Sequence, residues 1–157
     1  MRAGIVVLAG LLMWTIASAA RSYSRAPERS GTPADAIFGT DTAVPEPVRS
    51  ALRGACFDCH SNETRWPWYS SVPVVSSLIE HDVSEGRAQL NFSTWREYTT
   101  FERADLLDKI CEKATKREMP LWQYRLLHRE SRLNASDVAA LCEWSRREAG
   151  RLVGAGS

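Results

Sequence analysis

The stretch GACFDCHSNETRWPWY, residues 54–69, decides the predicted fold of this 157-residue chain. It places two cysteines three positions apart, a histidine directly after the second, and an aromatic segment soon afterwards. On a helical turn, residues i, i+3 and i+4 project from the same side. Cys56, Cys59 and His60 are therefore expected to face one common object.

Two thiols and an imidazole at this spacing form the set that attaches a c-type haem. The thiols add across the two haem vinyl groups as thioethers, and the imidazole ligates the iron. We therefore predict one covalent haem c, with Cys56 and Cys59 as attachment points and His60 as an axial ligand. The carbonyl of Pro67 or of Pro73 could accept the remaining ring N–H of His60.

Three other uses of the cysteine pair stay open. A thioredoxin-like redox pair needs a βαβ setting, of which the sequence shows no sign. A structural zinc site needs two further ligands, and Cys111 and Cys142 are available only on separate predicted helices. A disulfide between Cys56 and Cys59 would be strained at this spacing.

The segment after the motif offers polar-tipped aromatic side chains to the predicted haem. Trp66, Trp68 and Tyr69 each combine a flat apolar body with one N–H or O–H donor. Arg65 carries a permanent charge that suits a haem propionate. We predict that these four residues bind the cofactor, although each aromatic side chain could equally well be ordinary core.

The iron would have one more axial position. Met119 is the single methionine outside the predicted leader at residues 1–20, and Pro120 after it favours extended backbone, so Met119 is expected on a loop. We predict Met119 as the sixth ligand, with His81, His128 and an open iron as alternatives. A Met/His pair suits electron transfer, whereas an open position would permit peroxide or gas chemistry.

Apolar periodicity predicts about four helices with long loops between them. A short helix leads from residue 48 into the cysteines, and a second covers residues 73–86 and ends near Gly86. A third carries the stripe of residues 106–114 and stops before Pro120, and a fourth begins at Asn134 or Ser136 and ends at Gly150. No alternating strand pattern occurs, so the predicted class is all-α: a small cytochrome c-like domain around one covalent haem.

The domain is predicted to span residues 46–150, with a disordered tail at 151–157. Residues 4–20 form an apolar run after Arg2 and contain an A-x-A-like site at 17–19, so residues 1–20 are expected to be a signal peptide or a membrane anchor. Residues 21–45 are predicted to be a flexible linker. Arg21, Arg25 and Arg29 would favour a cytoplasmic C-terminal side, but the cysteine chemistry favours a periplasmic or periplasm-facing domain.

Charge argues against one class of partner. The formal net charge is +1 and no basic stripe is visible, so nucleic-acid binding is not expected.

Cys111 and Cys142 each lie on the apolar side of a predicted helix, where a disulfide or two buried thiols would fit. We expect free thiols, because a domain built around haem does not need the extra cross-link.

Two longer segments of the chain resemble a known protein family. CFDCHSNETRWPWYSSVPVVSSLIEHDVSEGRAQLNFSTW and the later MPLWQYRLLHRESRLNASDVAALCEWS resemble the bacterial haem-binding domain family built around a C-x-x-C-H motif, over residues 48–146. The layout is also similar to that of small class I cytochromes c. The resemblance implies a periplasm-facing domain with covalent haem. Some relatives are associated with dihaem peroxidase-like domains, which implies redox partner proteins and an electron-delivery role.

The functional expectation is therefore an exported cytochrome that carries single electrons and is itself no enzyme. The alternative is a catalytic, peroxidase-like accessory domain or a sensory domain with an open or exchangeable sixth ligand.

Overall fold

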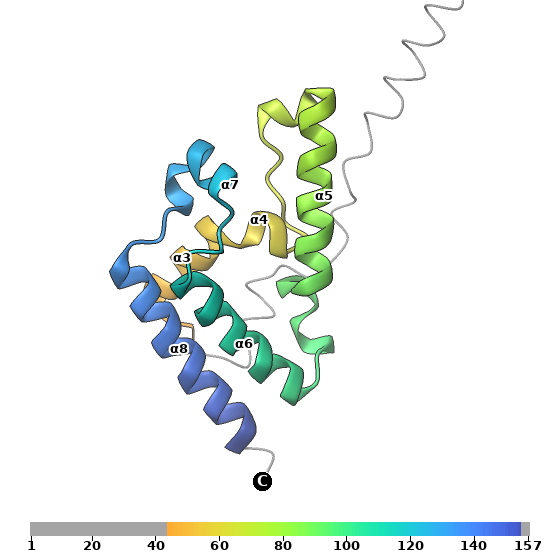
Figure 1. Cartoon of the computed structure of the whole chain (residues 1–157). Coiled ribbons are helices and arrows are strands. Elements are labelled where there is room, and N and C mark those ends of the chain that lie inside the picture. Colours follow the sequence, from red (N-terminus) through yellow and green to blue (C-terminus); the bar gives the residue numbers. More distant parts are fainter. Residues whose placement is uncertain (1–43, 155–157) are drawn as a thin grey trace, which may run out of the picture.

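The computed structural model describes residues 44–154, so the predicted leader, nearly all of the predicted linker and residues 155–157 lie outside it. The described chain forms α3 (Glu46–Ala55), α4 (Phe57–His60), η1 (Trp68–Ser71), α5 (Pro73–Gln89), η2 (Phe92–Glu97), α6 (Thr100–Thr115), α7 (Trp122–Leu127), η3 (Arg129–Ser131) and α8 (Ala135–Gly154) (Figure 1). No strand occurs among these described residues, which confirms the predicted all-α class.

Local sequence signals explain where the longer helices begin. The Thr99 hydroxyl accepts from the backbone N–H of Glu102, and the Glu102 carboxylate accepts from the backbone N–H of Thr99, which caps α6 reciprocally. Asn134 caps α8, since its side-chain oxygen accepts from the backbone N–H of Asp137 at 3.0 Å. Of the two predicted start residues of α8, Asn134 is therefore confirmed.

Helices α6 and α8 lie side by side in opposite directions and form one wall of the domain (Figure 1). Their facing residues Leu107, Leu141 and Trp144 are each at most 2% exposed. The segments from α3 to η2 close over this pair, and they contribute the buried side chains of Val48, Leu52, Phe57, Phe92 and Trp95. The C-x-x-C-H motif contributes to the main core, because Phe57, between Cys56 and Cys59, is buried and packs against Phe92 with ring centroids 5.1 Å apart.

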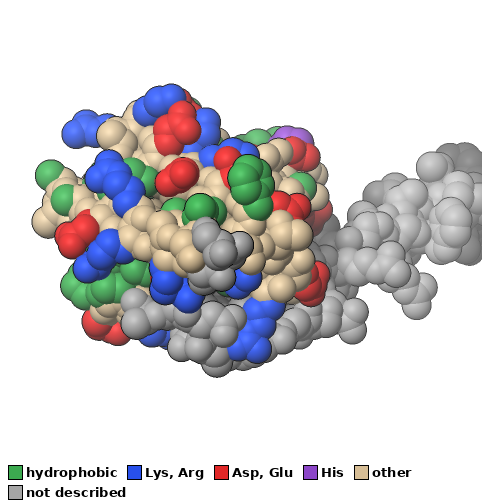
Figure 2. Space-filling model, turned by 90° about the horizontal axis from the view of Figure 1, so that it is seen from below, with side chains coloured by type: hydrophobic (Ala, Val, Ile, Leu, Met, Phe, Trp, Pro, Cys, Tyr) green, Lys and Arg blue, Asp and Glu red, His purple; other side chains and the backbone are tan. Residues whose placement is uncertain are grey.

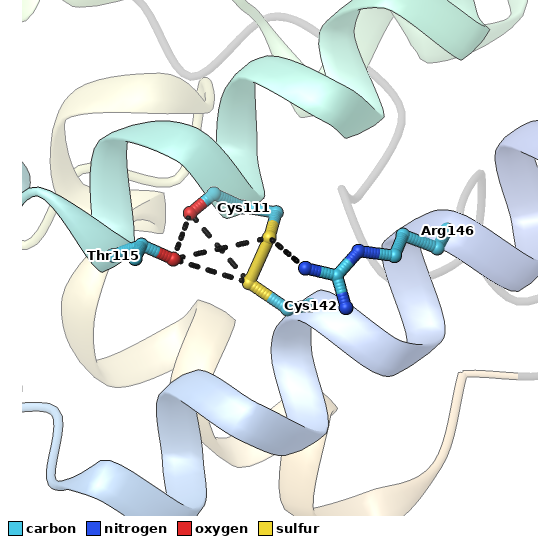
Figure 3. Close-up of a disulfide and its surroundings, with 4 residues drawn as sticks. All are labelled: Cys111, Thr115, Cys142 and Arg146. Carbon is cyan, nitrogen blue, oxygen red and sulfur yellow. Dashed lines mark hydrogen bonds between the residues drawn. A yellow bond between two sulfur atoms is a disulfide. The ribbon is translucent and has the colours of Figure 1, made fainter.

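A disulfide between Cys111 and Cys142 joins α6 to α8, so the expectation of free thiols is wrong (Figure 3). The sequence places each cysteine on an apolar helix face, but only the packing of the two helices brings their Cα atoms to 4.7 Å. The Thr115 hydroxyl lies 3.4 Å from Cys142 Sγ, and Arg146 donates to Cys111 Sγ at 3.8 Å. The cross-link therefore lies in a partly polar setting.

Removing this disulfide is expected to destabilise the domain. The cross-linked residues are 31 positions apart, and the loop-closure entropy of such a loop corresponds to about 3–4 kcal/mol. Denaturant unfolding of a Cys111→Ala/Cys142→Ala double variant should show this loss in the free energy of unfolding. An added dithiol reductant should destabilise the wild type similarly and leave the variant unchanged. Equal stability of wild type and variant in oxidising buffer would contradict the disulfide.

Helix α5 begins at Pro73 as predicted, but it differs from its prediction in where it ends and in how much of its apolar face is buried. It continues through Gly86 to Gln89, because Gly86 serves a close helix contact described below and does not terminate the helix. Its predicted apolar face is buried only in the second half, where Val83 is 3% exposed. Val74 and Leu78 are 83% and 53% exposed, since the first half of α5 extends beyond the rest of the domain (Figure 1).

Helix α8 continues past its predicted end at Gly150 to Gly154. Leu152 is buried, and nothing lies within 4 Å of a Cβ built at Gly150, so Gly150 neither needs nor imposes a turn.

Viewed from below, the described Lys and Arg side chains are interspersed with Asp and Glu (Figure 2). Within residues 44–154, no helix is both long enough and apolar enough to cross a membrane.

Candidate functional site

A cavity of about 540 Å³ opens between the C-x-x-C-H turn, α5, α6 and the connection from α6 to α7. Protein cavities that bind cofactors and other small ligands measure roughly 300–1,000 Å³. Much of the wall is apolar and comes from all parts of the domain, including Val83, Leu90, Phe92, Leu106, Ile110 and Leu141. The cavity therefore has the size and lining of a site for a large, mostly apolar ligand.

The three motif side chains all line this cavity, as their spacing predicts. Cys56 precedes α4, and Cys59 and His60 form its last turn. The backbone N–H groups of Cys59 and His60 both donate to the carbonyl of Cys56, at 3.2 and 2.9 Å. This helical turn places two thiols and one imidazole on the wall of one cavity.

The ring of His60 is held by the backbone of a distant segment. Its Nδ1–H donates to the carbonyl of Leu90 at 3.1 Å, so neither Pro67 nor Pro73 is the acceptor. Burial lowers the pKa of His60, which keeps the imidazole neutral near pH 7. With Nδ1 as the donor, Nε2 carries the free lone pair, which is the arrangement expected of a metal-ligating histidine.

The two thiols are not activated for redox exchange. Burial raises the pKa of Cys56 to about 12 and that of Cys59 to about 11, with smaller contributions from neighbouring groups. Redox-active C-x-x-C thiols have a lowered pKa. Cys111 and Cys142 are tied up in their disulfide and cannot supply two further zinc ligands. The raised thiol pKa values disfavour the dithiol interpretation, and the disulfide disfavours a zinc site built from all four cysteines.

Gly86 allows α5 to lie directly against the motif turn. A Cβ built at this position would stand 2.8 Å from the carbonyl oxygen of Cys59 and 3.2 Å from its Cβ, closer than side chains pack. Only glycine permits this distance without movement of one element. The contact therefore sets the position of Cys59 relative to α5.

Gly86→Ala is expected to destabilise the domain despite the higher helix propensity of alanine. Overpacking costs about 1–3 kcal/mol, against a propensity gain of about 1 kcal/mol. Gly150→Ala is the matched control, since its Cβ meets nothing within 4 Å and should stabilise α8 by about 0.5–1 kcal/mol. Denaturant unfolding of both variants measures the difference, and the same sign for both would contradict the close contact.

The site residues fit a haem, because they offer paired thiols, a neutral imidazole with a free Nε2 and a mostly apolar cavity. A family model described as a haem-binding domain matches residues 15–147, most of the chain. The chain belongs to this haem-binding domain family. Neither the comparison with curated proteins nor the comparison with solved structures gives a match.

The loop after His60 is fastened to the start of η2 in this haem-binding domain. The backbone N–H of Asn62 donates to Ser93 Oγ at 2.9 Å, and Asn91 Nδ2 donates to Asn62 Oδ1 at 3.0 Å. Arg87 Nε also donates to the carbonyl of Ser61, at 2.9 Å. These bonds explain why Leu90 lies where it can accept from His60.

Asp58, between the two motif cysteines, is a buried carboxylate with several donors. Arg65 Nε donates to Oδ1 at 3.1 Å and its terminal nitrogen Nη2 donates to Oδ2 at 3.1 Å. The Tyr124 hydroxyl donates to Oδ2 at 2.6 Å, and burial together with this bond raises the pKa of Tyr124, so the phenol keeps its proton. Asp58 therefore ties the C-x-x-C-H motif to α7.

An aromatic cluster continues from Tyr124 along the cavity wall. The Tyr124 and His128 rings stack with centroids 4.1 Å apart, and the Tyr69 hydroxyl and His128 Nε2 share a 2.5 Å hydrogen bond. All three residues line the cavity. His128 is thus engaged by two tyrosines.

The candidates for the sixth ligand lie in different places. Met119 and His128 line the cavity of the haem-binding domain, whereas His81 is exposed on α5 and is not part of the lining. Helix α6 ends at Thr115, before the predicted stop at Pro120, because Arg117 adopts a left-handed backbone with φ 58°. The N–H groups of residues 118 and 119 then donate back to the carbonyl of Lys113, and Met119 lies on a loop as predicted.

The four residues predicted to contact the cofactor divide into two pairs. Arg65 and Tyr69 line the cavity, although the guanidinium of Arg65 is bonded to Asp58. Trp66 and Trp68 do not line it, and Trp68 is 85% exposed. Lys109 and Lys113 of α6 also border the cavity and were not anticipated from the sequence.

Proposed function

We propose that this haem-binding domain is an exported c-type cytochrome that carries single electrons. In this proposal Cys56 and Cys59 hold the haem through thioethers, His60 Nε2 is one axial ligand and the Met119 thioether is the other. When bound, the haem iron supplies a ferric/ferrous couple, and Met/His ligation suits electron transfer more than catalysis.

One observation carries the proposal. The two thiols and the imidazole line a single cavity, and the Nδ1–H of His60 donates to the carbonyl of Leu90, which directs Nε2 away from that carbonyl. This hydrogen bond fixes the tautomer and orientation of the ring, which a ligand that must stay bound through redox cycling requires. The mostly apolar wall favours the less charged state of the cofactor.

Charged side chains at the rim suit the propionates. Lys109 and Lys113 line the cavity from α6, and Arg65 lines it beside the motif. Lys109 pairs with Asp105 at 2.8 Å on the exposed helix surface, a contact that contributes little and can be exchanged for another anion.

The proposed compartment is the periplasm or the periplasmic face of the inner membrane. The apolar run at residues 4–20 supports export, and the Cys111–Cys142 disulfide supports an oxidising environment. The proposed partners are redox proteins, with a dihaem peroxidase-like protein as one option.

Two measurements on holoprotein test the proposal. An anaerobic redox titration should show one reversible one-electron transition per chain. Carbon monoxide added to the reduced protein should bind slowly or weakly, because a sixth ligand occupies the iron. Fast carbon monoxide binding by the wild type would favour instead a catalytic or sensory haem protein with an open position.

A further inference from the structure

Helix α7 follows Met119 almost directly, and none of its residues is buried in the core of the domain. Only Pro120 and Leu121 separate Met119 from its first residue, Trp122. None of the six residues of α7, all of which the structure describes, is buried, and Trp122 is 66% exposed. Pro120 in the entering loop is buried, but hydrophobic burial does little to fix where the helix itself lies.

A hydrogen bond between side chains holds α7 in place instead. Tyr124 projects from the middle of α7, and its hydroxyl donates to Asp58 Oδ2 at 2.6 Å across 66 residues of sequence. Asp58 is 7% exposed and belongs to the motif turn, where Arg65 holds both carboxylate oxygens. A bond from a neutral hydroxyl to a buried carboxylate is stronger than an ordinary hydrogen bond.

The far side of Tyr124 is supported as well. Its ring stacks on His128, and His128 shares a short hydrogen bond with Tyr69. At the other end of the connection, the N–H of Met119 donates to the carbonyl of Lys113, the last full turn of α6. The Met119 loop is thus held at one end by α6 and at the other by the bond from Tyr124 to the haem motif.

We propose that Tyr124 is a positioning residue, which through Asp58 ties the Met119 loop to the haem attachment turn and so keeps the Met119 sulfur on the iron. The inference rests on the proposed function. Asp58, between the two cysteines, then fixes the position of the Met119 loop relative to the C-x-x-C-H turn. Tyr124 also lines the cavity, but in this role it acts through the loop that carries Met119.

Tyr124→Phe tests this proposal in holoprotein. The variant keeps the ring that stacks on His128 and leaves Asp58 paired with Arg65, so haem attachment and folding should persist. Losing one hydrogen bond to a charged group should lower the equilibrium constant for binding of the Met119 sulfur to the iron about tenfold or more. The apparent affinity of the reduced protein for carbon monoxide should rise by the same factor, the reduction potential should fall, and the methionine–iron charge-transfer absorption should weaken.

Trp122→Phe is the matched control on the same helix, because this side chain is exposed and lines no part of the cavity. It should leave carbon monoxide affinity, potential and absorption unchanged. An unchanged Tyr124→Phe variant, or an equal change in both variants, would overturn the positioning role. If instead the wild type itself lacks the methionine–iron absorption, or carries no covalent haem, the proposed function fails and the inference fails with it.

Discussion

Replacing Cys56 and Cys59 together by alanine is expected to abolish covalent haem completely and to leave a poorly folded chain. Both thiols line the cavity, and no other described cysteine is free to replace them, because Cys111 and Cys142 form a disulfide. A mostly apolar cavity of about 540 Å³ would then be left to water. The free energy of unfolding of a small domain is only about 5–15 kcal/mol. Losing the binding energy of a core cofactor therefore removes a large fraction of that stability.

Haem staining of a denaturing gel and circular dichroism measure the two effects. The single variants are informative controls, since each should retain one thioether and therefore part of the stain. The disulfide variant Cys111→Ala/Cys142→Ala should retain the full stain, because its cysteines lie outside the cavity lining. A double Cys56/Cys59 variant that keeps the full haem stain would contradict the assigned attachment points.

Met119→Ala is expected to lower the reduction potential by on the order of 100 mV, within the range of roughly 0.8 V over which axial ligands act. A thioether favours the ferrous state, and alanine offers no ligand, so the iron should also bind carbon monoxide rapidly. Met119 is 38% exposed and lies on a loop, and its loss should therefore cost little stability. Haem attachment and the His60 contacts should stay intact.

His81→Ala and His128→Ala separate the alternatives. His81 is exposed on α5, so its replacement should change neither potential nor ligand access. His128 already engages Tyr69 and stacks on Tyr124, so its replacement should have only a moderate effect through this cluster. A Met119→Ala variant with the potential of the wild type would remove Met119 from the iron.

The features that could be predicted depend on residues close together in the sequence. The shared face of Cys56, Cys59 and His60 follows from one helical turn, and the loop position of Met119 follows from Pro120. The start of α8 follows from the capping side chain of Asn134. Each of these signals acts within about four residues, and each structural outcome agrees.

The features that could not be predicted depend on contacts across the fold. The acceptor for His60 is Leu90, 30 residues away, and the partner of Asp58 is Tyr124, 66 residues away. A single sequence contains no signal that pairs such residues. Gly86 was interpreted as a helix end because glycine commonly has that role, whereas here it permits contact with Cys59.

The disulfide and the aromatic segment show the same limit. Two cysteines on apolar helix faces fit burial as well as bonding, and only the packing of α6 against α8 decides between them. Trp68 has an amphipathic side chain suited to a haem contact, but η1 turns it outward. Residue chemistry restricts what a side chain can do, and the tertiary fold decides which neighbour it meets.

The central claim is that haem is joined to the chain through the two motif thiols. Intact-mass spectrometry of the denatured wild type, produced together with haem-maturation machinery, tests it directly. We predict one haem per chain, retained under denaturing conditions and located on the peptide that contains Cys56 and Cys59. A polypeptide of unmodified mass, with both of these thiols free to react with an alkylating agent, would contradict it.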